Sequence, residues 1–168
     1  MQAKLNKSSN PVDLYQYYVD QATGTNINPR SLLATDYLNH FNEVIMIIDM
    51  ISDMIECVED VTSWRPKSYV EHFRDSGFSD RDLAVAAYEY VPDIYKRPFE
   101  TIITQLNGLI LQVAGQLKEA ANRCDHAEIA RAARFAPELR LLAEKAGGII
   151  NGEAEGTDQE DIDAMLNN

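Results

Sequence analysis

The chain has 168 residues and a mass of 18.9 kDa, with 45% hydrophobic and 25% charged side chains, which suits one globular domain. Its 27 acidic residues outnumber 15 basic ones, so the net charge is −12 and the isoelectric point lies near 4.6. Nucleic acids and anionic membrane surfaces both attract basic segments, so this balance argues against either as a partner.

The cysteine content and the short apolar runs indicate the cellular compartment that we expect for the protein. Cys57 and Cys124 lack any metal-binding spacing, and two thiols in a chain of this length are typical of a reducing environment. The unbroken apolar runs are short, for example residues 44–48, whereas a membrane span needs about 18 residues. Residues 1–10 carry lysines without the apolar stretch of a signal peptide. We therefore expect a soluble cytoplasmic protein.

The first half of the chain predicts two helices joined by a turn. Pro11 follows Asn10, a favoured N-cap residue, and opens a helix that should end near Ala22. After a loop and a short turn over 28–33, apolar residues recur every three or four positions over residues 36–61, which predicts a long amphipathic helix. Ile47, Met50 and Met54 widen its apolar stripe, so we expect two packing neighbours.

The second half predicts further helices separated by proline and glycine. Ser68 should cap a short helix through Arg74, and another helix should cover residues 80–90. Pro98 opens a second long helix over 98–123. A helix from His126 is interrupted by Pro137 and should end at the glycine pair 147–148.

These elements predict an all-α fold, because no strand-like alternation longer than about four residues occurs. The expected architecture is a helical bundle built on a long antiparallel hairpin of the segments 36–61 and 98–123, with shorter flanking helices. We divide the chain into a bundle domain (1–148), an acidic flexible linker (149–157) and a short amphipathic partner-binding helix (158–168).

The motifs of common enzymes and metal sites are absent. The Glu-x-x-His pairs of di-metal bundles, glycine-rich phosphate loops, zinc spacings and nucleophile elbows do not occur. His72 lies in the least regular stretch and His126 at a helix start, so both should be solvated or locally hydrogen-bonded, while His40 belongs to the first long helix. We expect no metal and no cofactor.

The stretch 64–82 gathers aromatic and basic residues in a loop-rich part of the chain. Aromatic and arginine side chains together are typical of binding hot spots. The alternative is that the aromatic rings anchor this connection over the ends of the long helices, and the sequence leaves both interpretations open. The candidate surface residues are Trp64, Arg65, Tyr69, Arg74 and Phe78.

Residues 146–168 differ from the rest of the chain in charge. No basic residue follows Lys145, and six acidic residues lie between 146 and 168. Thr157 and Glu160 form a capping box, and Ile162, Met165 and Leu166 share one helical face. Such a helix is too short to be stable alone, but it could fold in a groove on a partner.

The residues 158–167, Asp-Gln-Glu-Asp-Ile-Asp-Ala-Met-Leu-Asn, resemble the N-terminal peptide of the flagellar motor switch protein. More loosely, they are similar to the C-terminal peptide of the chemotaxis phosphatase CheZ. Both peptides bind the phosphorylated chemotaxis response regulator on its receiver domain. The resemblance covers about 10 residues and implies a contact set of Gln159, Ile162, Asp163, Ala164, Met165 and Leu166.

The body of the chain does not match CheZ, whose catalytic Asp and Gln lie in a motif that the helix 98–123 lacks. Other response-regulator phosphatases use an acid and an amide three residues apart on a helix, where the amide orients the attacking water. That spacing occurs here three times, and Glu119 with Asn122 is the preferred weak candidate for a catalytic pair. The other two pairs are Asp36 with Asn39 and Asp13 with Gln16.

Three hypotheses follow from the sequence. The first is a bacterial signalling adaptor whose C-terminal peptide binds a receiver domain in chemotaxis or motility control. The second is a phosphatase that acts on a phosphorylated response regulator through an acid–amide pair. The third is a structural or self-associating helical protein, such as a homodimer, whose tail docks on its own bundle.

Overall fold

The computed structural model describes residues 10–153, and this part of the chain is all-α. Its one β-type contact is an isolated bridge between Ile27 and Ala34. The α-helices are Pro11–Ala22 (α1), Asn39–Met50 (α2), Val58–Ser63 (α3), Tyr69–Asp75 (α4), Arg81–Ala87 (α5), Asp93–Asn122 (α6), His126–Arg131 (α7) and Ala136–Ile150 (α8). The 3₁₀ turns are Thr35–Leu38 (η1), Ile55–Cys57 (η2), Tyr88–Tyr90 (η3) and Ala132–Phe135 (η4).

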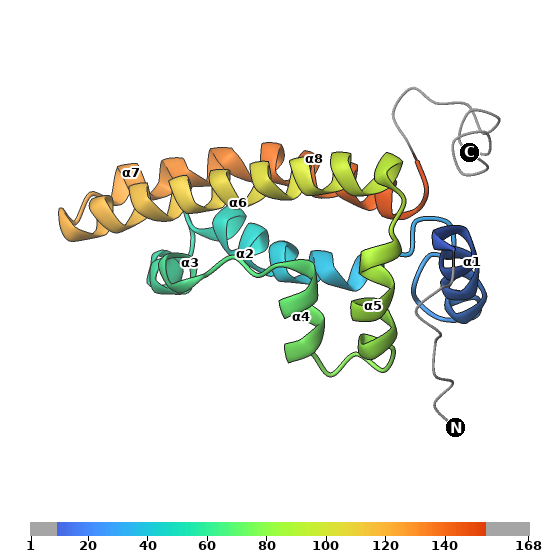
Figure 1. The fold of residues 1–168 in the computed structure, drawn as a ribbon. Coiled ribbons are helices and arrows are strands. Elements are labelled where there is room, and N and C mark those ends of the chain that lie inside the picture. The colour runs from blue at the N-terminus through green and yellow to red at the C-terminus, as the bar shows by residue number, and fades with distance from the viewer. Residues whose placement is uncertain (1–9, 154–168) are drawn as a thin grey trace.

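A hairpin of α6 with α7, η4 and α8 runs the length of the molecule (Figure 1). The chain reverses at Cys124, which adopts the left-handed conformation with a φ of 54°. Asp125 then caps α7, because its side chain accepts a hydrogen bond of 3.0 Å from the backbone N–H of Glu128. The predicted hairpin of 36–61 with 98–123 is therefore wrong in its first member: the antiparallel partner of α6 is the segment 126–150.

The helix predicted over 36–61 is not continuous, because α2 ends at Met50. The backbone N–H groups of Asp53 and Met54 both turn back to the carbonyl of Met50, and Met54 leaves the helical region with a ψ of 63°. Ser52 and Asp53 favour such a turn, because their side chains compete with helical hydrogen bonds. After the turn, α3 packs against α6, whereas α2 packs against α8 and η4.

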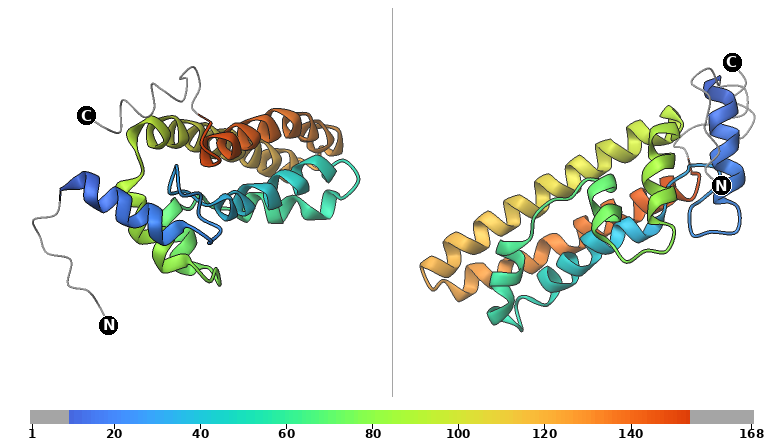
Figure 2. Two further views of the ribbon diagram at one scale, coloured as in Figure 1. Left: turned by 90° about the vertical axis from the view of Figure 1, so that its right-hand side faces the viewer. Right: turned by 60° about the horizontal axis from the view of Figure 1, so that its bottom comes forward.

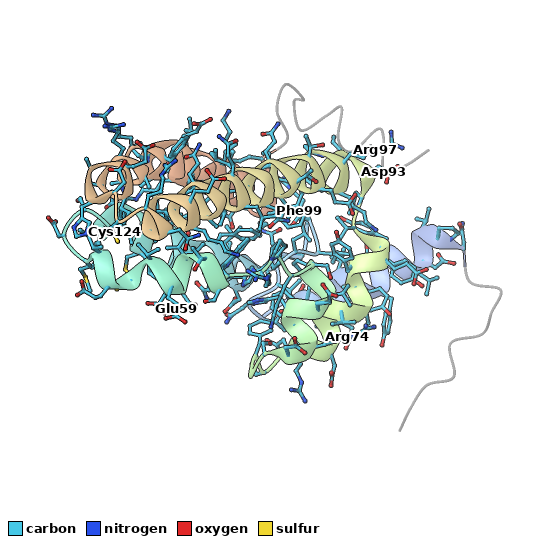
Figure 3. All side chains as sticks on the ribbon, turned by 90° about the vertical axis from the view of Figure 1, so that its left-hand side faces the viewer. Glu59, Arg74, Asp93, Arg97, Phe99 and Cys124 are labelled. Carbon is cyan, nitrogen blue, oxygen red and sulfur yellow. The ribbon has the colours of Figure 1, made fainter. Side chains whose placement is uncertain are left out.

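The helix predicted from Pro98 begins five residues earlier, at Asp93. Pro98 removes one backbone donor from the second turn of α6. The first turn is nevertheless formed: the N–H of Lys96 donates to the carbonyl of Pro92 over 2.9 Å, and Arg97 pairs with Asp93 over 3.0 Å. Figure 3 shows Asp93 and Arg97 together at this end of the helix.

The glycine pair 147–148 does not end α8, which continues to Ile150. Its end is a Schellman motif: the N–H of Glu153 donates to Gly148 over 2.9 Å, and the N–H of Gly152 donates to Ile149 over 3.0 Å. Gly152 has a φ of 92°, which suits glycine. Residues 149–153, which the sequence assigned to the linker, therefore belong to the folded body, and the rest of the proposed linker lies outside the described residues.

The remaining helices cover one end and one side of this hairpin. In Figures 1 and 2, α4 and α5 form a pair below α6, and α1 lies at the end where α8 finishes. The predicted helices at 11–22 and 68–74 are confirmed, and residues 80–90 form α5 continued by η3. The core runs along α6, whose buried residues include Phe99, Leu106, Ile110, Val113 and Leu117.

Candidate functional sites

The aromatic residues of the stretch 64–82 turn inward. Tyr69 is only 2% exposed, stacks on Tyr88 at 4.7 Å and accepts a hydrogen bond of 2.9 Å from the N–H of Ala34. Phe78 packs against the buried ring of Phe73. These rings fasten α4 to the body, so Tyr69 cannot contact a partner and the anchoring interpretation holds for it.

The two arginines of that candidate surface are exposed and lie apart from the rings. Arg65 is held by the backbone, because its guanidinium donates to the carbonyls of Thr62 and Trp64 over 2.9 and 2.8 Å. Arg74 projects from α4 into solvent (Figure 3). The sequence therefore placed five residues on one surface that the structure divides between interior and exterior.

Three rings form a half-buried cluster, the His40 cluster, which consists of His40, Trp64 and His72. Trp64 stacks on His40 at 4.9 Å and donates its indole N–H to the carbonyl of His40 over 3.1 Å. Nε2 of His40 is buried without a hydrogen-bond partner among the described residues. Burial lowers the pKa of both histidines, and the charge of Lys67 lowers them further.

The His40 cluster has too few ligands for a metal ion. His72 lies 6.1 Å from His40, and no group of three or more His, Cys, Asp or Glu residues within 10–153 is arranged to hold a metal. His72 is half-buried and bonds to the backbone of Asp36, which is distant in sequence, so it is neither solvated nor locally bonded; His126 is exposed, as expected.

A cleft of about 460 Å³ lies between the start of α4, η3 and the middle of α6. Tyr88 donates to Glu100 over 2.9 Å, and Oδ1 of Asn107 is buried without a described partner. Burial raises the pKa of Tyr88, and that of Tyr37 beside it, so neither phenol is poised to ionise. The cleft offers hydrogen-bonding groups but no activated nucleophile.

A second cavity, the α2–α8 groove, has a volume of about 530 Å³. Its apolar lining includes Met46 on α2 and Gly147 on α8, and the ion pair of Arg140 with Asp49 bridges the two helices beside it. The full lining is Leu38, Asn42, Ile45, Met46, Arg140, Ala143, Glu144 and Gly147. Sequence reasoning missed this groove, although the methionine spacing on α2 was a signal for it.

The acid–amide pairs lie outside both cavities. Glu119 and Asn122 are exposed at the C-terminal end of α6, one turn apart. Gln16 donates to Asp20 over 2.9 Å, and Asp36 sits in η1 beside His72. Glu119 with Asn122 and Asp13 with Gln16 expose both side chains, whereas Asp36 is half-buried.

The predicted partner-binding residues all lie outside the described part of the chain. They are Gln159, Ile162, Asp163, Ala164, Met165 and Leu166. Within residues 10–153, no helix combines the length and the apolar character that crossing a bilayer requires. No protein-family model matches the chain, and no curated protein or solved structure is significantly similar to it.

Proposed function

We propose that this protein is a cytoplasmic bacterial signalling adaptor that binds the receiver domain of a response regulator, in chemotaxis or motility control, through residues 158–167. The observation that carries the proposal is the residue order Gln159 to Leu166, whose spacing would put Ile162, Met165 and Leu166 on one face of a helix. Met165 stands where the resembling peptides have leucine, and a hydrophobic groove accepts that volume-conserving exchange.

The described body supports the proposal through the place at which the chain leaves it. Ile149 and Ile150 are buried, and the hydroxyl of Ser31 donates to the carbonyl of Ile150, so the last turn of α8 is fastened. Only residues 154–157 separate the body from the peptide. A bound receiver would thus be kept within about 15–20 Å of this end, which raises its local concentration there.

The direct test is a titration of the full chain with chemotaxis-type receiver domains, with and without beryllium fluoride, which mimics the aspartyl phosphate. We expect the activated receiver to bind more tightly. Leu166→Ala should weaken that binding about tenfold, because it removes one buried leucine from the contact. Asn168→Ala, at the end of the chain beyond the contact set, is the matched control. Equal affinity for Leu166→Ala and the control would refute the proposal.

A phosphatase is the second candidate function, favoured by the exposure of Glu119 and Asn122 at the end of α6. In that mechanism the amide orients water and the carboxylate holds a lysine of the receiver. Asn122→Ala should then abolish the acceleration of phosphate release, whereas Gln116→Ala, another exposed amide on α6, should not. If the full chain leaves the rate of phosphate release unchanged, the phosphatase candidate is refuted.

The structural hypothesis is tested by truncation after Glu153. The truncation must start there, because removing Ile149 and Ile150 would open the core whatever the tail does. A fall in melting temperature on deletion of 154–168 would favour a tail that docks on its own bundle. An unchanged melting temperature is what the adaptor proposal expects.

A further inference from the structure

The cleft between the start of α4, η3 and α6, which we call the α4–α6 cleft, has a fixed aromatic base. The rings of Tyr37, Tyr69 and Phe99 pack against one another there, with centroids 5.4, 5.9 and 6.1 Å apart. Tyr37 donates to the carbonyl of Lys67 over 2.7 Å, and Tyr69 accepts from the N–H of Ala34 over 2.9 Å. Because these bonds hold the rings in place, the cleft keeps its shape without a ligand, and binding costs little ordering entropy.

One face of α6 supplies a polar wall of the α4–α6 cleft. Glu100, Thr104 and Asn107 line it and lie three or four residues apart, so they share one face of the helix. Residues 66–71 also line the cleft and bring a second carboxylate, that of Glu71. The cleft therefore has polar groups from two segments of the chain around an aromatic base.

Most side-chain donors of the α4–α6 cleft are already used within the protein. The hydroxyl of Tyr88 donates to Oε1 of Glu100 over 2.9 Å, and that of Thr104 donates to the carbonyl of Glu100 over 2.8 Å. Lys67 is the one basic side chain among the described residues that line the cleft, and its ammonium donates to Asp75 over 3.0 Å. A ligand that needs donors from the protein would find few here.

Acceptors of the α4–α6 cleft, in contrast, remain unpaired. The buried Oδ1 of Asn107 has no hydrogen-bond partner among the described residues, which lowers stability until a donor reaches it. Since Asn107 is only half-buried, rotation about its broad χ2 torsion would bring this oxygen to a ligand. Glu100 and Glu71 each use one carboxylate oxygen, for the hydroxyl of Tyr88 and the N–H of Ser68, and no described group donates to the other oxygen. The cleft therefore suits a ligand that brings donors.

The charges at the α4–α6 cleft favour a cation. Burial raises the pKa values of Tyr37 and Tyr88, and the carboxylates of Glu71 and Glu100 raise them further, so negative potential reaches both phenols. Lys96 lies over the ring of Tyr88 at 4.7 Å, but it donates to the carbonyl of Tyr88 and does not line the cleft. Two carboxylates and one paired lysine leave the lining with net negative charge.

From these observations we infer that the α4–α6 cleft binds a small organic amine in its ammonium form. An ammonium group has donors and no acceptor, which complements the unpaired oxygens of Glu100 and Asn107. Its bond to a carboxylate is charge-assisted and therefore stronger than a neutral one. The apolar body of the amine would lie against Ile103 and Pro66. This site is separate from the proposed receiver-binding peptide and does not depend on it.

The test uses the ¹⁵N-labelled full chain and three ligands that share a phenyl ring and a two-carbon chain. They are phenethylamine, 2-phenylethanol and phenylacetate, which at about pH 7 are cationic, neutral and anionic. We expect phenethylamine alone to bind in a titration followed by nuclear magnetic resonance. Its binding should shift the backbone amide resonances of residues 67–71 and 100–107.

Glu100→Gln should weaken binding of phenethylamine at least about tenfold, because a charge-assisted bond becomes a neutral one. Glu138→Gln is the matched control, because it removes an exposed acid of α8 outside the cleft and should leave the affinity unchanged. Asn107→Leu should weaken binding about fivefold without lowering the melting temperature, because the oxygen that it removes is unpaired. Leu166→Ala should leave the affinity for phenethylamine unchanged, which separates this site from the receiver-binding peptide.

Four outcomes would overturn the inference. The first is no binding of phenethylamine at about 10 mM, the weak limit for a specific small ligand. Equal binding of 2-phenylethanol would reduce the interaction to apolar contact. Equal affinities of Glu100→Gln and Glu138→Gln would reduce it to general attraction between a cation and an acidic protein. Resonance shifts confined to residues outside 67–71, 88 and 100–107 would place the amine elsewhere on the molecule.

Discussion

The aromatic stretch 64–78 and the two methionines of α2, Met46 and Met50, differ in burial in a way that their residue types do not suggest. The aromatic rings lie in an irregular stretch that resembled a binding surface, yet Tyr69 and Phe73 are buried. Met46 and Met50 lie within the regular apolar pattern of a helix, yet both are exposed. Whether an apolar side chain is buried depends on whether another element packs over it. Helical periodicity does not show which element, if any, does so.

Hydrogen bonds help to hold the aromatic residues in the interior, and the methionines of α2 have no such bonds. The phenol of Tyr69 accepts from the N–H of Ala34, and the phenol of Tyr37 donates to the carbonyl of Lys67 over 2.7 Å. These bonds join the chain at η1 to the chain around the start of α4, across 35 and 30 residues of sequence. A methionine has no comparable group, so nothing but apolar contact would fix a neighbour over Met46.

The largest expected difference between the two regions is in how much an alanine substitution lowers the free energy of unfolding. Tyr69→Ala should lower the free energy of unfolding by about 3–5 kcal/mol, because it leaves a cavity among packed rings. Met46→Ala, at an exposed site, should stay within about 0.5 kcal/mol of the unsubstituted chain. Urea denaturation measures both values, and similar losses for the two variants would contradict the difference in burial.

Two glycines near the end of α8, Gly147 within the helix and Gly152 just after it, should respond in opposite directions to the same change. Gly147→Ala should stabilise the protein by about 0.5–1 kcal/mol, because alanine is the better helix former and its Cβ meets only an ordinary contact. Gly152→Ala should destabilise it by at least about 1 kcal/mol, because a side chain at a φ of 92° is strained and its Cβ would lie 2.7 Å from Arg30. Thermal denaturation separates the signs.

The stability of the protein should also depend on pH, through His40 and His72. The pKa values of His40 and His72 are lowered from 6.5 in the folded protein, so below that pH the unfolded chain takes up protons more readily. Their contribution to stability is therefore present above pH 6.5 and is lost as the pH falls through the folded pKa values.

The matched measurement compares urea midpoints at about pH 7.5 and about pH 5.5, on either side of the ordinary histidine pKa. Replacing both His40 and His72 with glutamine should reduce the loss of stability on acidification. His126→Gln, which changes an exposed histidine, should leave that loss unchanged. A loss of stability that depends on His126 instead would disprove the role of His40 and His72.

The smallest effect is expected for the ion pair that spans the groove. Arg140 and Asp49 expose 49% and 41% of their side chains, so water screens their attraction. Arg140→Ala should cost about 0.2–1 kcal/mol of unfolding free energy, and added salt should reduce that cost. A larger loss would mean that this pair, and not the packing of α2 on α8, holds the two walls together.

The sequence predicted the elements whose ends carry local signals. Pro11 marked the start of α1, and Ser68 with Glu71 forms the capping box of α4. The break after Met50 was missed because Ile51, Ile55 and Val58 continue the apolar spacing of α2 across the turn, so the pattern looked unbroken. The antiparallel partner of α6 was missed because helical periodicity shows which face is apolar but not which neighbour covers it.

The same distinction between local signals and long-range packing applies to the candidate sites. The peptide 158–167 is a local motif and stays a prediction, since it lies outside the described residues. The α2–α8 groove was missed, because the methionine spacing on α2 does not show that Met46 and Gly147, about 100 residues apart in sequence, line the same cavity. The glycine pair was assigned to a helix end because glycine is common there, yet Gly147 lines the groove and the helix ends only beyond Ile150.

The reversal at Cys124 gives the molecule a built-in attachment point for a spectroscopic probe. Its thiol is exposed at the tip of the hairpin (Figure 3). The other cysteine, Cys57, is half-buried and has a raised pKa that slows alkylation. A dye on Cys124 would lie about 35 Å along the hairpin from the last turn of α8, by the rise of an α-helix. Energy transfer to a labelled receiver would then report at which end of the hairpin the regulator is held.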